Sequence, residues 1–445
     1  MGGDMDEYLA RRNKVAAQMR SDSIAILPGA NIQSRNSDSE YPFRQNSDFY
    51  YLTNFSEPCA LMALCKDGNG TVSFTLFNQA RNPDLEVWTG KRAGQDGACK
   101  IYNADAAYDI ETIDSVMPEL FANKQVIYYP LGVDHTFDLK ILKWLQDSKS
   151  RLLSKNSTAT AAVSFVPDSL VDVLPFIHEL RLYKSDLEIE YMRKAAQISA
   201  AAHLKLMQEC KAGQFEYQLE AIFNAHCLQF GCRSLAYNSI VAGGNNACTL
   251  HYVANDQLLC DGDLVLIDAG GEYNNYAADI TRTFPVNGKF SDTQKQIYNI
   301  VLEAQLAGIA QIKPGNTINK VQEVMVEIIV KGLLKIDILQ GDAKQLIKDQ
   351  AYRKYYMHSS GHWLGLDTHD VGKYKLNNQW RKFQPGMVLT VEPGIYISKD
   401  FNEVDPKWHG IGVRIEDDIL VTKNGHEVLS CNAPKKIEEI ELAAL

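Results

Sequence analysis

The sequence predicts two domains, an α/β domain over residues 1–177 and an α+β domain over residues 178–445. Three observations predict this organisation. The chain has 445 residues, which is too long for one small hydrophobic core. Before Pro175, short apolar runs alternate with helical stretches, a pattern typical of α/β domains. After Pro175, stretches dense in Glu, Lys, Arg, Ala and Leu predict long helices, and acid-bearing strands follow them.

The first domain is predicted to alternate strands with helices. Charged, amphipathic stretches predict helices over residues 7–20 and 138–149. Runs rich in β-branched, aromatic and other apolar residues predict strands between and around these helices. The predicted strands cover residues 23–27, 48–53, 60–64, 71–77 and 125–129.

The second domain is predicted to contain four long helices, which come in two pairs separated by glycine-punctuated strands. The first helix begins with Ser185-Asp-Leu-Glu188, the pattern of a capping box, in which two side chains each bond the other residue's backbone N–H. The four predicted helices cover residues 184–210, 216–230, 291–312 and 318–339.

Composition and charge exclude several classes of protein. A net charge of -10 without a long Lys/Arg run argues against a nucleic-acid partner, because phosphate binding requires a basic face. No apolar run approaches the roughly 18 residues of a membrane span, and the polar N-terminus is not a secretory signal. The 9 cysteines form no CxxC pair, which predicts a reduced, cytoplasmic protein without a thiolate zinc site.

Two aspartates lie on the arms of a predicted β-hairpin. Asp268 ends an apolar run, Asp279 opens the next one, and residues 272–276 form a polar turn between them. A turn centred between Tyr273 and Asn274 would place the two aspartates opposite each other, with Cβ atoms about 5 Å apart. Carboxylates at that distance repel unless a cation lies between them. The alternative is that one of the two acids points to solvent.

Two glutamates close later apolar segments. Glu392 follows the apolar run 387–391 and precedes Pro393, where strand pairing ends, so it is expected in a site rather than on the surface. Glu416 lies in the run 411–421, where alternation puts it on the same face as Arg414. Glu416 is either a metal ligand, with Arg414 as the cation that orients it, or part of an ordinary solvated strand face.

Three histidines, His358, His362 and His369, lie within twelve residues, in a segment too rich in glycine to be an ordinary helix. A lone histidine is more often a hydrogen-bonded core residue than a ligand. Here one imidazole would complement four carboxylates, the mixture of nitrogen and oxygen ligands that a pair of divalent metals requires. Such a metal pair activates water for hydrolysis, so the sequence predicts a dinuclear hydrolase site.

The chain resembles the pita-bread metallopeptidases, which include methionine aminopeptidase, prolidase and aminopeptidase P. The five ligand positions of that family fall, in the family's order, on Asp268, Asp279, His362, Glu392 and Glu416. The resemblance implies a pita-bread catalytic domain that binds two divalent metal ions, most often manganese. Ser360 and Thr368 depart from the aliphatic residues usual in the family, but both lie between functional positions.

The first domain narrows the resemblance to aminopeptidase P. Residues 39–55 (SEYPFRQNSDFYYLTNF) and 87–94 (VWTGKRAG) are similar to the amino-terminal signatures of those enzymes. Ordinary methionine aminopeptidases lack this domain, whereas prolidases carry a related one. Prolidase is therefore the alternative. Trp88 lies in a region that in aminopeptidase P reaches a neighbouring subunit's active site, which implies a homodimer or homotetramer.

The resemblance also implies an activity and roles for individual residues. The substrates would be peptides with proline in second position, from which the N-terminal residue is released. Glu392 would move the proton from water to the leaving nitrogen, and His369 would stabilise the tetrahedral intermediate. His251 and His358 would position the proline side of the substrate, and Tyr396 and Arg414 match supporting positions behind the metals.

Three alternative functions are compared with this prediction. A prolidase would cleave only Xaa-Pro dipeptides. A binding module would have the same fold without the chemistry, but all five ligand positions are present here. A hydrolase of non-peptide substrates has no specific support in the sequence.

Overall fold

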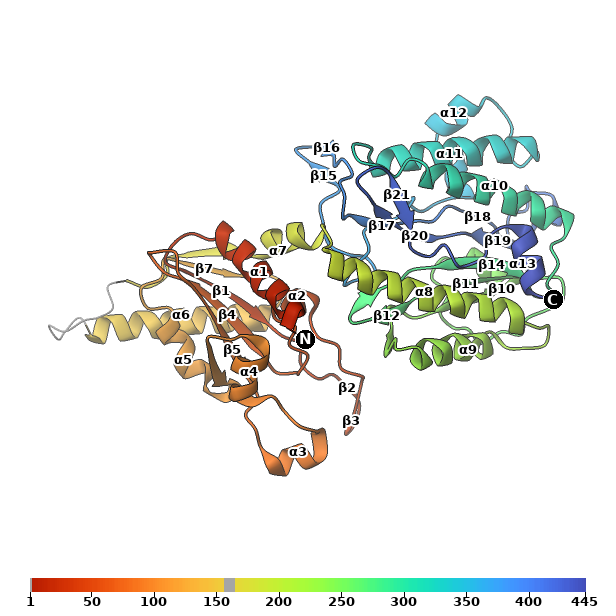
Figure 1. The fold of residues 1–445 in the computed structure, drawn as a ribbon. Helices are drawn as coiled ribbons and strands as arrows, with labels where there is room; N and C mark the ends of the chain where they lie inside the picture. The colour runs from red at the N-terminus through yellow and green to blue at the C-terminus, as the bar shows by residue number, and fades with distance from the viewer. Residues whose placement is uncertain (1, 156–164) are drawn as a thin grey trace. The chain divides into compact units, whose positions relative to one another are not determined.

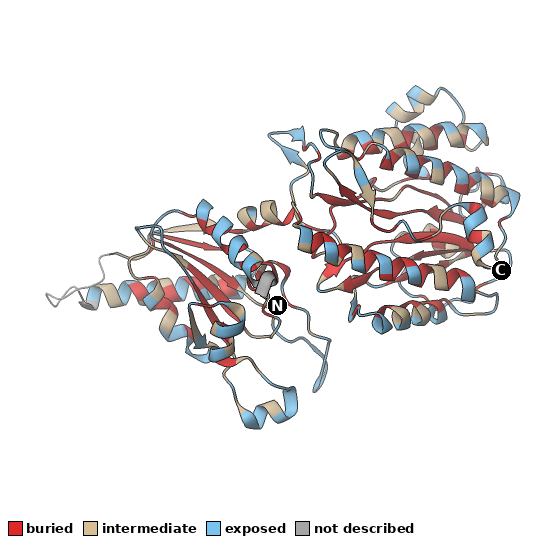
Figure 2. Ribbon diagram, in the orientation of Figure 1, coloured by how far each residue is buried: buried red, intermediate tan, exposed pale blue. Residues whose placement is uncertain are grey.

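The computed structural model describes residues 2–155 and 165–445 (Figure 1). The chain forms two compact units, Met1–Leu180 and Arg181–Leu445, so the division lies close to the predicted boundary at residue 177. Each unit has its own hydrophobic core. Figure 2 shows that the buried residues of each unit lie along the strands and on the inward faces of the helices.

The first unit is built on a six-stranded mixed sheet with the strand order β6-β5-β4-β1-β7-β8. The central strands β1 and β4 run antiparallel, as do β4 and β5, whereas β1 pairs parallel with β7. A separate short hairpin, β2 (Ser34–Asn36) with β3 (Ser39–Glu40), follows the first strand. The sheet strands are β1 (Ser23–Pro28), β4 (Leu61–Lys66), β5 (Val72–Asn78), β6 (Ala106–Asp109), β7 (Val126–Tyr129) and β8 (Ser169–Asp172).

Helices cover both faces of this sheet. On one face, Met117 of α5 and Trp144 of α6 join the apolar side chains of β1, β4 and β7 in one core. On the other face, Arg12 of α1 donates to the carbonyl of Leu52 in α2. The helices of the unit are α1 (Gly2–Gln18), α2 (Ser47–Thr53), α3 (Pro83–Thr89), α4 (Gly94–Tyr102), α5 (Ile113–Leu120), α6 (His135–Lys155) and α7 (Leu174–Arg181).

One predicted strand of this unit is wrong. Residues 48–53 are rich in aromatic residues, which favours a strand, but they form helix α2. The side chain of Asn46 caps the helix by accepting from the backbone N–H of Phe49 at 3.0 Å, and Asn54 ends it in the left-handed region (φ 57°). The capping residues on both sides therefore outweigh the strand propensity of the residues between them.

The second unit packs two helix pairs around small sheets, the α+β arrangement that was predicted (Figure 1). Ser185 and Glu188 form the predicted capping box at the start of α8. The four long predicted helices are all present, and their ends differ from prediction by at most four residues. The helices are α8 (Asp186–Glu209), α9 (Glu216–Gln229), α10 (Asp292–Ile309), α11 (Ile318–Lys335), α12 (Ala343–Lys348) and α13 (Ile437–Ala443).

The strands of the second unit form several short antiparallel sheets. One sheet has the order β10-β11-β14 and another the order β17-β20-β21, while β18 pairs with β19. The strands are β9 (Ser234–Leu235), β10 (Ile240–Gly243), β11 (Leu264–Asp268), β12 (Gly271–Tyr273), β13 (Tyr276–Ala277), β14 (Thr281–Pro285), β15 (Lys375–Leu376), β16 (Gln379–Trp380), β17 (Val388–Val391), β18 (Gly394–Ile397), β19 (Ile411–Arg414), β20 (Asp417–Val421) and β21 (His426–Val428).

The predicted register of the first hairpin is wrong by two residues. Asp268 pairs with Thr281 rather than with Asp279. The turn is centred between Asn274 and Asn275, which both adopt positive φ (50° and 66°), a geometry that asparagine tolerates well. Asp279 therefore lies between β13 and β14, outside the regular ladder, and its backbone N–H is bound by the carboxylate of Asp418.

Candidate metal centre

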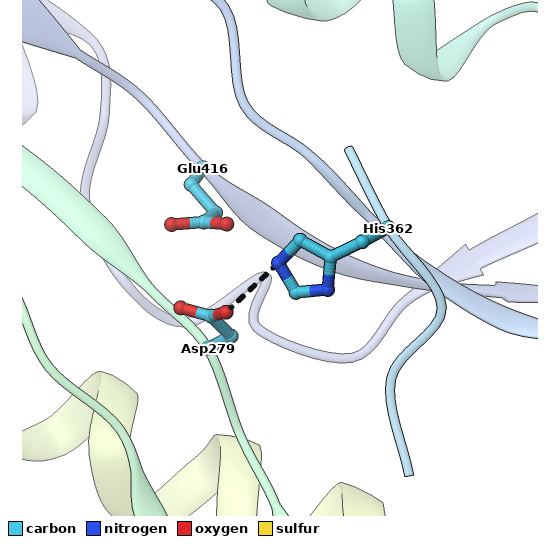
Figure 3. A group of neighbouring side chains, drawn as sticks. All are labelled: Asp279, His362 and Glu416. Atoms are coloured by element: carbon cyan, nitrogen blue, oxygen red, sulfur yellow. Dashed lines mark ion pairs between the residues drawn. The ribbon is translucent and has the colours of Figure 1, made fainter. Parts of the chain in front are cut away.

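Three of the predicted ligands meet at one point in the second unit. Ligand atoms of Asp279, His362 and Glu416 all lie within 4.8 Å of one another (Figure 3). They come from three distant segments: the link between β13 and β14, the glycine-rich histidine segment, and the break between β19 and β20. Because neither acid lies within a regular strand, both carboxylates can turn toward the imidazole.

The other two predicted ligands lie beside this cluster, Asp268 linked to it through the hydroxyl of Tyr237 and Glu392 through His362. The hydroxyl of Tyr237 lies 2.5 Å from Oδ1 of Asp268 and 2.7 Å from Oδ1 of Asp279, so it bridges the two aspartates. Oε1 of Glu392 lies 3.6 Å from Nε2 of His362. The structure thus places all five predicted ligand residues in one site.

His362 presents one ring nitrogen to the acids. Its Nδ1 lies 3.0 Å from the carbonyl of Trp363, and since a carbonyl only accepts, Nδ1 carries the hydrogen. Nε2 faces Asp279 Oδ2 at 3.3 Å. A backbone carbonyl that fixes the far nitrogen is the usual support of a metal-binding histidine. The arrangement turns Nε2, the nitrogen that can bind either a proton or a cation, toward the acids.

Most of the carboxylates in the cluster resist ionisation. Burial, with the charge of Asp279 nearby, raises the pKa of Glu392 to about 7. Burial and the repulsion of Asp279, Glu392 and Asp268 raise the pKa of Glu416 well above its usual range. Burial also raises the pKa of Asp268, although Arg414 opposes the shift. The nearby positive charges therefore do not balance the negative charge that these acids would carry if all were ionised.

Asp279 and His362 form an ion pair. Burial opposes charge on both groups, but their hydrogen bond outweighs it. The pKa of Asp279 is therefore lowered, and that of His362 is raised to about 9. The proton on His362 stands where a divalent cation would bind. One imidazole nitrogen and four carboxylates fit such a cation, which would supply the missing positive charge.

Arg414 connects the acids to the residues behind them. Its Nη2 donates to Asp268 Oδ2 at 2.7 Å, its Nη1 to the hydroxyl of Tyr396 at 3.1 Å, and its Nε to Thr281 Oγ1 at 3.1 Å. The alternative of a solvated strand face is wrong, because Arg414 is 4% and Glu416 2% exposed. Arg414 therefore orients Asp268 from within the protein.

His358 lies beside the cluster as a neutral group. Its Nδ1 lies 2.9 Å from the Ser359 carbonyl and must donate, so Nε2 accepts from the Tyr396 hydroxyl at 2.8 Å. Burial and the charge of Arg414 lower the pKa of His358 to about 3. Although Nδ1 is 3.7 Å from Glu392, a neutral imidazole forms no ion pair there.

His369 and His251 lie on the solvent side of the site. Both side chains are exposed, and the rings of His369 and His362 have centroids 4.2 Å apart. Burial and the charge of His362 lower the pKa of His369. His251 lies near enough to contribute to the lowered pKa values of His358 and His369. The exposed histidines thus mark the side from which a substrate can enter.

Sequence reasoning missed four residues that hold the ligands in place. Thr281 donates to Glu416 Oε2 at 2.6 Å, and the hydroxyl of Thr390 lies 3.2 Å from Glu392 Oε1. Each threonine lies two residues from a predicted ligand. Residues two apart on a strand share one face, so this rule could have identified Thr390, which lies on the strand leading to Glu392. Tyr237 and Asp418 have no such signal, because Tyr237 is remote in sequence and Asp418 resembles its acidic neighbours.

Family models match both units of the chain. Residues 190–423 match metallopeptidase family M24, and residues 8–128 match the aminopeptidase P N-terminal domain. The chain belongs to the M24 metallopeptidases. The predicted resemblance is therefore confirmed, and with it the fold of an aminopeptidase P-type α/β domain followed by a pita-bread domain.

Relatives of this M24 protein are similar over nearly their whole length. Xaa-Pro aminopeptidase of Escherichia coli is 43% identical over 98% of this chain and 96% of its own. The Haemophilus influenzae protein of the same name is 45% identical, with the same coverage. The solved structure of Pseudomonas aeruginosa aminopeptidase PepP has a TM-score of 0.95 at 47% identity, covering 99% of this chain and 97% of that one. The structure of zinc-substituted E. coli aminopeptidase P in complex with product has a TM-score of 0.94 at 43% identity. That match covers 99% of this chain and 98% of the other.

Proposed function

We propose that this M24 peptidase is a metal-dependent Xaa-Pro aminopeptidase, which releases the N-terminal residue from peptides with proline in second position. The observation that supports the proposal is the cluster of Asp279, His362 and Glu416, with the acids Asp268 and Glu392 beside it, in a chain that also has the aminopeptidase P N-terminal domain. The names of the relatives at 43% and 45% identity support the same activity. Prolidase remains the alternative, because it shares the ligand set.

The proposed metal ligands are Asp268, Asp279, His362, Glu392 and Glu416. Four carboxylates and one imidazole favour manganese over softer ions, which prefer thiolates and additional imidazoles. Two such ions, when bound, lower the pKa of water and polarise the scissile carbonyl. The resident metal is best identified by elemental analysis of protein purified without added metal.

Glu392 is the proposed proton carrier of the reaction. An Xaa-Pro bond is a tertiary amide, so its nitrogen has no hydrogen and must be protonated as the bond breaks. Glu392 lies beside the proposed ligand His362, with Oε1 3.6 Å from Nε2, so its carboxylate stands where it can take a proton from water and return it to the leaving nitrogen. The Thr390 hydroxyl, 3.2 Å from Oε1, holds the carboxylate in place.

The three remaining histidines are the proposed substrate contacts. His369, exposed beside His362, would stabilise the oxyanion of the tetrahedral intermediate. His251 and His358 would position the proline side of the peptide. Tyr396 and Arg414 would act behind them, since Arg414 donates to Tyr396 and Tyr396 donates to His358. Burial and the charge of Arg414 keep His358 neutral, so its Nε2 can accept from Tyr396.

A homodimer or homotetramer is the proposed assembly. In the first unit, α3 has no buried residue, and its Val87 and Trp88 are 81% and 85% exposed. Apolar side chains exposed in this way favour contact with another subunit. Among the described residues no helix is long and apolar enough to cross a membrane. The cytoplasmic location stays a prediction.

Hydrolysis of matched peptides tests the proposal. Metal-stripped protein refilled with manganese is expected to release the first residue from Xaa-Pro-Yaa tripeptides and longer chains. Cleavage of Xaa-Pro dipeptides alone would establish prolidase instead. Inactivity on both, in protein that contains two metal ions, would refute either peptidase. Glu392→Gln is the matched variant for the proton role, and turnover near that of the wild type would contradict that role.

A further inference from the structure

One loop of the second unit brings His251 to the site. It comprises residues 243–257, from the last residue of β10 into the link toward β11, and includes one short 3-10 helix, Gly244–Cys248. Residues 249–257 form neither helix nor strand, so no backbone ladder holds His251 in place. Another group must therefore fix this part of the loop.

The carboxylate of Glu216 binds this loop at four points. Its Oε1 accepts from the backbone N–H of Gly243 at 2.7 Å and from Asn246 Nδ2 at 3.0 Å. Its Oε2 accepts from the Tyr252 hydroxyl at 2.7 Å and from the backbone N–H of Gln257 at 3.0 Å. These contacts span both ends of the loop, and Tyr252 is the residue next to His251.

The electrostatics of Glu216 require a carboxylate rather than an amide. Glu216 is fully buried at the first position of α9, where the helix N-terminus favours negative charge, and none of its four partners is charged. An ionised carboxylate only accepts, and four donors satisfy it. A glutamine would place its NH2 group, which cannot accept a hydrogen bond, opposite two of those four donors. Hydrogen bonds to a charged acceptor are also about twice as strong as neutral ones.

We propose that Glu216 is a positioning residue for peptide recognition: by binding both ends of the loop and the Tyr252 hydroxyl, it holds His251 where the proline side of the substrate binds. The inference rests on the proposed function, because it takes His251 as a substrate contact. Glu216 itself touches no reacting atom and acts only through the loop.

A matched control lies one turn further along α9. Glu220 binds the same loop, but its Oε2 accepts a single hydrogen bond, from Asn255 Nδ2 at 3.0 Å. An amide oxygen can accept that bond equally well. Glu220→Gln is therefore expected to keep kcat/KM within about twofold of the wild type. Glu216→Gln makes the same chemical change at a position that an amide cannot satisfy.

The test is a double-mutant cycle on kcat/KM for an Xaa-Pro-Yaa tripeptide, with metal content measured for every variant. Glu216→Gln is expected to lower kcat/KM about tenfold to a hundredfold with two metal ions still bound, because a buried charged network is broken. In a His251→Ala background the same substitution should change kcat/KM less than about twofold. Losses that multiply in the double variant would overturn the proposal, since Glu216 would then act other than through His251.

Tyr252→Phe decides the question if Glu216→Gln does not fold. It removes one hydroxyl beside His251 and is expected to lower kcat/KM about threefold to tenfold, again only when His251 is present. No effect of Tyr252→Phe, or full activity of His251→Ala, would overturn the proposal while leaving the peptidase activity established. Failure of the wild type to cleave the tripeptide would instead refute the proposed function.

Discussion

Glu416 and Asp417 are adjacent in sequence and both are buried, yet their surroundings are opposite. The Glu416 carboxylate faces the acids of the candidate metal centre, and its pKa lies well above the usual range. The Asp417 carboxylate contacts Arg282 at 2.7 Å and Lys435 at 2.6 Å. Burial opposes its ionisation, but these two cations lower its pKa. Of these two neighbours, the acid without a matched cation faces the candidate metal centre, whereas the acid with two cations belongs to the scaffold.

The scaffold cluster supports the metal centre from behind. The Arg282 guanidinium donates to Asp417, to the carbonyl of Glu416 at 2.6 Å, and to the carbonyl of Ala433 at 3.0 Å. It thereby ties the segment that bears Glu416, between β19 and β20, to β14 and to the C-terminal segment. The two clusters together show how one segment of sequence can provide both a ligand and the anchor that holds it.

The largest expected effect concerns catalysis. Glu416→Gln should lower kcat/KM at least about a thousandfold, because weakened metal binding removes several kcal/mol of transition-state stabilisation. Tripeptide hydrolysis and metal content per chain measure both consequences. Glu427→Gln, which changes a partly exposed acid paired with Arg193, is the control and should remain active. Two tightly bound metals and near-normal turnover in Glu416→Gln would exclude Glu416 as a ligand.

The second prediction contrasts stability in the protein without metal. Asp417→Asn should lower the free energy of unfolding by about 3–5 kcal/mol, because it leaves buried Arg282 with an unmatched charge. Glu416→Gln should leave that free energy unchanged or raise it, because it relieves repulsion among acids. Urea denaturation in the presence of a chelator measures both. Equal losses in the two variants would show that the two clusters do not differ in this way.

The third prediction concerns pH. The folded-state pKa of Glu392 is raised from 4.5 to about 7, so folding favours its protonated form. As the pH rises from about 4.5 through about 7, the contribution of Glu392 to the free energy of unfolding is lost. The loss is on the order of 2–3 kcal/mol by pH 8. Metal-free protein should lose thermal stability between pH 5 and 8, and Glu392→Gln should reduce this loss. His362, with its pKa raised to about 9, adds stability below pH 6.5 that is lost in the same direction.

Metal-loaded protein provides the control for that pH dependence. A bound cation replaces the protons of the cluster, so its stability should vary less over the same range. The opposite sign is expected for Asp417, whose lowered pKa contributes stability above about pH 3.8 that is lost on acidification. A metal-free protein that becomes more stable between pH 5 and 8 would contradict the raised pKa of Glu392.

The smallest effect is expected on the surface. Arg193 and Glu427 form a two-point ion pair with both N···O distances at 2.7 Å, but their side chains are 41% and 38% exposed. Arg193→Ala should therefore lower the free energy of unfolding by less than about 1 kcal/mol. Arg282→Ala, which leaves Asp417 without its fully buried partner, should lower it several times more. Similar urea midpoints for the two variants would remove burial as the reason for the difference.

The sequence predicted the elements better than their pairing. Long helices such as α8 were predicted within a few residues, because periodicity and caps are local properties. The helix at residues 47–53 and the hairpin register were not, because both depend on capping and turn geometry that the apolar pattern does not reveal. The structure also moved Glu416 out of the regular strand, which alternation alone had placed within it.

By itself, the sequence determined the kinds of chemistry available: four acids and a histidine in motifs that point to metals, and a chain with two domains. Residue types and short motifs are local, so they can be read without a structure. Only the tertiary structure decided which acid faces which partner. Glu416 and Asp417 differ because each contacts residues more than a hundred positions away, such as Thr281 and Arg282. Burial and charge balance arise from those distant contacts, and they separate a site from its scaffold.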